Sequence, residues 1–98
     1  MAEEESRPGI KPWGPFEDRD FHIISLPEYS KNLLVSSDPG STMNVLVRAK
    51  NLKEEEESDT LVPNGQVQFT AGDSKWKEFS FKGLGRRNQL AYGQYRFW

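Results

Sequence analysis

The cationic and aromatic side chains near the C-terminus are the residues whose types and spacing could do chemistry. Proteins that bind single-stranded nucleic acid combine a cationic groove with rings on which bases stack. The residues that fit this chemistry are Lys82, Arg86 and Arg87 for phosphate, with Trp76, Tyr92 and Trp98 as stacking platforms. The same rings are also the largest apolar side chains of a chain that is only 35% hydrophobic, and a core would use them first. The pattern therefore favours core rings, with polyanion binding kept as the alternative.

Two rings near the N-terminus are bracketed by prolines. Trp13 lies between Pro12 and Pro15, and Phe16 follows directly. Proline stiffens the segment, so ordering these rings against a surface costs little entropy. They either cap this domain's own core or bind a partner. The predicted partner-binding residues are Trp13, Phe16 and Trp98.

Catalytic and metal-binding groups are few. His22 is the only histidine, cysteine is absent, and the Glu54–Glu57 run lacks the alternating ligands and glycine of a calcium loop. The Gly83–Arg87 segment lacks the G-x-x-x-x-G-K-[ST] pattern of a phosphate loop. We therefore predict no catalytic, cofactor-binding or metal-binding residue, and a protein that is not an enzyme.

Charge is distributed unevenly along the 98 residues, which carry a net charge of −2. Residues 51–60 hold one basic and five acidic groups, whereas residues 61–98 hold six basic and two acidic groups. The basic C-terminal third points weakly to an anionic partner. No apolar run resembles a signal peptide or a membrane span, and cysteine is absent, so we expect an intracellular, cytoplasmic protein without membrane contact.

The elements expected to position these residues are short strands. Thr42–Lys50 alternates, with Met43, Val45, Val47 and Ala49 on one face and Arg48 and Lys50 on the other. Turn residues at 37–41 predict a hairpin between Leu33–Ser36 and Met43–Ala49, and those at 83–88 predict one between Trp76–Phe81 and Leu90–Trp98. Residues 27–34 fit either a helix or a strand. We predict one helical turn at Pro27–Lys31, followed by a strand at Leu33–Ser36.

This pattern predicts a mainly β fold, a small antiparallel β-sandwich or barrel with at most one short helical turn. Residues 1–15 are expected to form a flexible acidic arm and residues 16–98 a single domain. Phe97 is expected to point inward and Trp98 outward. The predicted core residues are Ile23, Leu34, Val45, Val47, Val67, Phe69, Phe79, Phe81 and Tyr95.

The function that these observations favour is a non-enzymatic protein-interaction or assembly module, in contact with a protein partner or with further copies of itself. A lean core and rings at both chain ends motivate this prediction. The alternative is binding of single-stranded nucleic acid or another polyanion by the basic, aromatic C-terminal hairpin.

Overall fold

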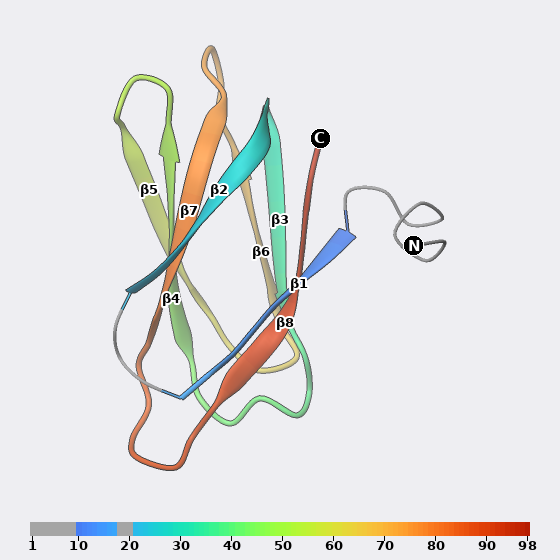
Figure 1. Cartoon of the computed structure of the whole chain (residues 1–98), viewed down its shortest axis with the longest axis vertical. Helices are drawn as coiled ribbons and strands as arrows, with labels where there is room; N and C mark the ends of the chain where they lie inside the picture. Colours follow the sequence, from blue (N-terminus) through green and yellow to red (C-terminus); the bar gives the residue numbers. More distant parts are fainter. Residues whose placement is uncertain (1–9, 18–20) are drawn as a thin grey trace.

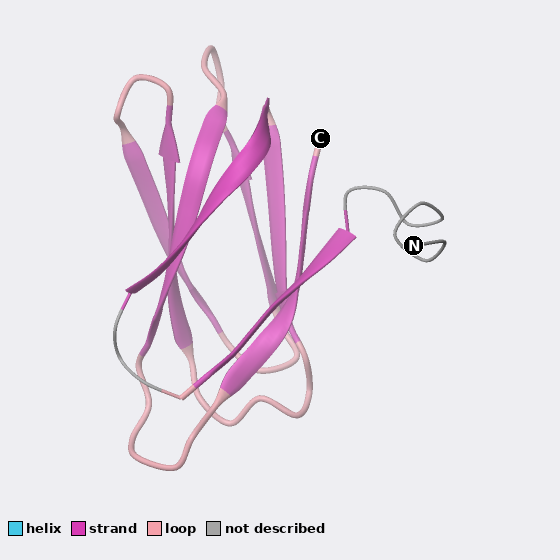
Figure 2. Cartoon of the chain, viewed as in Figure 1, coloured by secondary structure: helices cyan, strands magenta, loops and turns pink. Residues whose placement is uncertain are grey.

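All regular structure in this computed structural model is β, and the structure describes residues 10–17 and 21–98. The strands are β1 (Ile10–Phe16), β2 (Phe21–Ser30), β3 (Asn32–Ser37), β4 (Val45–Asn51), β5 (Glu56–Leu61), β6 (Gln66–Thr70), β7 (Trp76–Gly83) and β8 (Ala91–Phe97). Figure 2 shows that no helix interrupts them within the described residues.

The strands form two four-stranded antiparallel sheets that pack face to face (Figure 1). Sheet A has the order β1-β8-β3-β6, and sheet B has the order β2-β7-β4-β5. Only β4 and β5 are consecutive strands of one sheet, and every other connection crosses to the opposite sheet. Eight strands wound between two open sheets in this way form a jelly roll. The predicted mainly β sandwich is therefore confirmed.

The two predicted hairpins are wrong. β3 belongs to sheet A and β4 to sheet B, and β7 and β8 are likewise separated. The turn residues mark where the chain reverses, but a reversal can lead across the sandwich as well as to a neighbouring strand. β7 and β8 meet through their inward side chains, where the ring centroids of Phe79 and Tyr95 are 4.8 Å apart.

The predicted helical turn at Pro27–Lys31 is also wrong, because β2 stays extended as far as Ser30. Between Ser25 and Ser30 its register against β7 shifts, so β2 bulges there. A single helical turn is unstable without tertiary support. The extended chain instead places Leu26 in the core and Ser30 beside Trp76.

The core lies between the sheets and is rich in rings. Trp76, Phe79 and Phe81 are its largest fully buried side chains. Seven of the nine predicted core residues are buried: Val45, Val47, Val67, Phe69, Phe79, Phe81 and Tyr95. The prediction that Ile23 and Leu34 belong to the core is wrong. Each lies one residue from an inward position, and a shift of one residue moves a strand side chain to the opposite face.

β1 contains residues 10–15 of the segment that was expected to be an arm. Residues 10–13 and Phe16 pair with β8 at the edge of sheet A, so the sandwich begins before residue 16. Pro12 and Pro15 are compatible with this place because an edge strand needs hydrogen bonds on one side only. The rest of the predicted arm, residues 1–9, lies outside the described residues.

Candidate functional site

The outer face of sheet B brings together side chains from four strands. Antiparallel register places Ile23 of β2 opposite Ser80 of β7, and Ser80 opposite Arg48 of β4. Because strand side chains alternate between faces, these residues point away from the core, whereas Phe79 and Phe81 point into it. The sequence of β7 thus supplies rings to the core and small or polar groups to the outer face.

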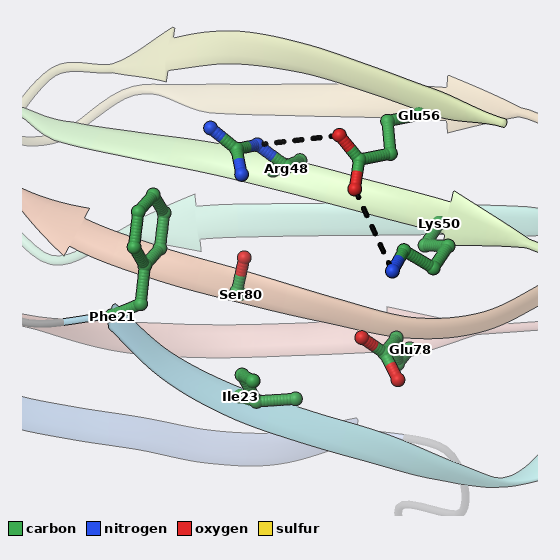
Figure 3. Close-up of a pocket in the computed structure, with 7 residues that line it drawn as sticks. All are labelled: Phe21, Ile23, Arg48, Lys50, Glu56, Glu78 and Ser80. Carbon is green, nitrogen blue, oxygen red and sulfur yellow. Dashed lines mark ion pairs between the residues drawn. The ribbon is translucent and has the colours of Figure 1, made fainter. Parts of the chain in front are cut away.

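A shallow hollow opens on this face (Figure 3). Its lining residues are Phe21, Ile23, Arg48, Lys50, Glu56, Glu78 and Ser80. Ser80 has the shortest side chain of the set and lies between β2 and β4, which leaves the floor low. The hollow has a volume of about 180 Å³. Pockets for drug-sized ligands measure about 300–1,000 Å³, so this hollow suits one or two side chains of a peptide.

Two apolar side chains line the β2 side of the hollow. Ile23 is 64% exposed and Phe21 is 39% exposed. The guanidinium carbon of Arg48 lies 4.7 Å from the centroid of the Phe21 ring, and the Nζ atom of Lys82 lies 5.4 Å from it. Cations near a ring face are attracted by its quadrupole. Exposed apolar groups beside cations are therefore the main feature of this side.

The opposite side of the hollow carries charges of both signs. The Nε atom of Arg48 lies 3.8 Å from Glu56, and the Nζ atom of Lys50 lies 3.7 Å from the same carboxylate. These half-exposed pairs are long, and such pairs contribute only about 0–1 kcal/mol. A charged group of a ligand could therefore replace one partner of these ion pairs at little cost in free energy. Figure 3 also shows Glu78 near the Lys50 end.

The N-terminal rings predicted to bind a partner lie in or against the core. Trp13 is 3% exposed, stacks on Phe81 with ring centroids 4.4 Å apart, and donates its indole N–H to the Ser36 carbonyl oxygen at 2.8 Å. Phe16 packs against the core cluster and stacks on His22 with centroids 3.8 Å apart. The burial of Trp13 leaves no free ring face, so we assign it no partner.

The predicted polyanion-binding residues are spread over the molecule. Trp76 is 1% exposed and packs edge-on against Phe69. Lys82 follows six positions along β7, about 20 Å away at the rise of a strand. Arg86 and Arg87 are exposed in the loop between β7 and β8. Tyr92 is half-buried in β8, in sheet A. The structure does not gather these residues into one groove.

The last two residues lie on the predicted faces of the strand, with Phe97 inward and Trp98 outward. Phe97 is partly buried against the core, whereas Trp98 is 47% exposed. The guanidinium carbon of Arg96 lies 4.5 Å from the Trp98 ring centroid. Two backbone hydrogen bonds between Asn32 and Trp98, at 3.0 and 3.2 Å, tie the end of the chain to sheet A.

This hollow is not apparent from the sequence alone, although part of its signal is present there. The alternation of β4 correctly placed Arg48 and Lys50 on the face opposite the core residues. The assignment of Ile23 to the core concealed the apolar side. Had Ile24 been taken as the inward residue, Phe21 and Ile23 would have appeared together on the outer face.

Comparison with known proteins returned no matching family model, no similar curated protein and no similar solved structure. Within the part of the chain that the structure describes, no helix is long and apolar enough to cross a membrane. The same residues contain no group of three or more histidine, cysteine or acidic side chains placed to hold a metal ion.

Proposed function

We propose that this protein is a non-catalytic protein-interaction module that binds a peptide segment of a partner on the outer face of sheet B. The segment carries an apolar side chain next to an acidic one. The apolar side chain packs on Phe21 and Ile23, and the acidic one pairs with Arg48. The observation that carries the proposal is Ile23, which is 64% exposed at the rim of a hollow sized for a peptide side chain.

The composition of this face supports a protein ligand. Aromatic residues and arginine are enriched in protein interfaces. Its cations Arg48, Lys50 and Lys82 lie near the carboxylates of Glu56 and Glu78, so the face carries charges of both signs and not the one-signed field that a polyanion requires. Fully burying an isoleucine contributes about 1.5–3 kcal/mol, so covering Ile23 would contribute about 1–2 kcal/mol to binding.

Polyanion binding remains the weaker proposal. The exposed pair Arg86 and Arg87 supports it, but the burial of Trp76 removes a stacking platform. Titration of the protein with a single-stranded oligonucleotide at low salt tests it through tryptophan fluorescence. Quenching that disappears with added salt and in the Arg86→Ala plus Arg87→Ala variant would favour polyanion binding over the peptide proposal.

Selection from a random peptide library displayed on phage tests the main proposal. We expect enriched sequences to share an apolar residue beside an acidic one. A synthetic peptide with that sequence should bind the Ile23→Thr variant about tenfold more weakly, because about 1.4 kcal/mol of contact is lost. Threonine keeps the β-branch, so the strand itself should persist.

Tyr29→Thr is the matched control, since Tyr29 is an exposed residue of the same strand that does not line the hollow. This variant should bind the peptide as the wild type does. Equal binding by wild type and the Ile23→Thr variant, or enrichment without the apolar–acidic pattern, would refute the proposal. Light scattering of the unliganded protein separately tests the predicted self-association.

A further inference from the structure

The free edge of β6 differs from the other three sheet edges of the sandwich. An exposed strand edge pairs readily with another chain, and proteins block it with proline, charge or a bulge. β1 has two prolines and an irregular register, and β2 has Pro27 and a bulge. β5 carries Glu56, Glu57 and Asp59. β6 has none of these devices, since its sequence QVQFT is uncharged and its register against β3 is regular.

The backbone groups that β6 leaves unpaired follow from its pairing with β3. Ser37 donates its N–H to the Gly65 carbonyl oxygen at 2.9 Å, and Ala71 donates to that of Lys31 at 2.9 Å. Residues of an antiparallel strand alternate between bonding to the neighbour and pointing away from it. The N–H and C=O groups of Gln66, Gln68 and Thr70 therefore point to the free edge. Within the described residues, β6 pairs with β3 alone.

The neighbouring strand of the other sheet makes this side of the sandwich acidic. Asp59 lies opposite Val47 and Glu57 opposite Ala49, so both carboxylates share the core-facing side of β5. Both side chains are nevertheless exposed. In Figure 1, β5 and β6 rise from the short loop that joins them, and they form the edges of the two sheets on this side of the sandwich.

We propose that the edge of β6 binds an extended segment of a protein partner by strand addition, and that this segment carries lysine or arginine at alternate positions. Backbone hydrogen bonds to Gln66, Gln68 and Thr70 provide affinity, and alternate side chains provide selectivity. The side chains of the bound segment that point to the same side as the core residues of sheet A lie beside Glu57 and Asp59. This second surface is distinct from the hollow on sheet B.

Charge favours a basic partner over a second copy of this chain. In a symmetric pairing of two β6 edges, Gln68 would lie opposite Gln68 of the second copy. The same symmetry would bring Glu57 and Asp59 of both copies to one side of the joined sheet. Like charges in this position oppose assembly, whereas a basic segment neutralises them.

Amide hydrogen exchange measured by NMR tests the proposal, with a synthetic peptide of about seven alternating lysine and threonine residues as the probe. At saturation, the amides of Gln66, Gln68 and Thr70 should exchange about tenfold more slowly. The amides of Val67 and Phe69 should not change, because they already bond to β3. Absence of this alternating protection at saturation would overturn the proposal.

Charge variants test the selectivity. Replacing both Glu57→Gln and Asp59→Asn should weaken binding of the lysine peptide about tenfold, and added salt should weaken it for the wild type. Thr60→Lys is the control, since it adds a positive charge to β5 on the opposite face. It should change the affinity less than about threefold. Equal binding of a glutamate–threonine peptide would contradict the assignment of a basic partner.

Gln68→Pro removes an outward N–H without removing a bond to β3, so it should abolish peptide binding while circular dichroism stays that of the wild type. If this variant does not fold, the exchange pattern of the wild type alone decides. Protection of the same three amides by self-association, without peptide, would show that a second copy occupies the edge and would overturn the proposal. None of these variants replaces a residue that lines the hollow on sheet B.

Discussion

At the scale of single residues, Tyr95 makes the stability of the folded protein depend on pH in the alkaline range. Its ring lies in the core against Phe79, and burial raises the pKa of its phenol. The folded state therefore favours the neutral phenol. This contribution to stability is complete below the usual tyrosine pKa of about 10 and is lost as pH rises through the raised pKa.

Tyr95→Phe removes this titration while keeping the ring. Urea unfolding at a series of alkaline pH values should show a smaller loss of unfolding free energy for the variant than for the wild type. Lysine titration contributes equally to both proteins, so the difference reports Tyr95. Identical losses for the two proteins would indicate that the phenol is hydrated in the folded state.

The last two residues provide a second test at this scale. Phe97→Ala should lower the free energy of unfolding by about 2 kcal/mol, below the usual 3–5 kcal/mol because Phe97 is only partly buried. Trp98→Ala should cost about 0.5 kcal/mol, as for other surface changes, since alanine keeps the two backbone bonds to Asn32. Chemical denaturation measures both, and a larger cost for Trp98→Ala would invert the assignment of faces.

At the scale of elements, the β4–β5 hairpin depends on one buried asparagine. The Oδ1 atom of Asn51 accepts hydrogen bonds from the backbone N–H groups of Lys53 and Glu55, each at 2.9 Å. Its Nδ2 atom donates to the Glu55 carboxylate at 2.9 Å. The side chain thus holds the turn that brings Glu56 to the start of β5.

Asn51→Ala leaves these donors without their acceptor and should cost about 1–3 kcal/mol of stability. Asn44→Ala is the matched control, because Asn44 is an exposed asparagine just before the same strand. It should change stability by less than about 0.5 kcal/mol. Equal costs in a urea titration would contradict the role assigned to Asn51.

At the scale of the whole molecule, the sequence predicts strands better than their partners. Alternation identified β4 and most of the core, because inward and outward positions differ in chemistry along each strand. It did not predict that β7 and β8 lie in opposite sheets, since the Gly83–Asn88 segment specifies a reversal but not its direction. The choice of sheet depends on all eight strands at once.

The candidate site was harder to predict than the fold for a related reason. Its residues come from β2, β4, β5 and β7, and none of them is unusual within its own strand. Arg48 and Lys50 appear as ordinary outward charges, and Ile23 as an ordinary core residue, until the register places them around Ser80. The basic, aromatic C-terminus was the more conspicuous pattern, yet its rings Trp76, Phe79, Phe81 and Tyr95 are needed in the core.

Amide chemical-shift mapping tests the central claim most directly. The protein is labelled with ¹⁵N and titrated with the apolar–acidic peptide obtained by selection. We predict that the largest shifts occur at Phe21, Ile23, Arg48 and Ser80, and that they vanish in the Ile23→Thr variant but persist in the Tyr29→Thr variant. Shifts confined to the loop around Arg86 and Arg87, or to sheet A around Trp98, would contradict the assignment of the outer face of sheet B as the binding surface.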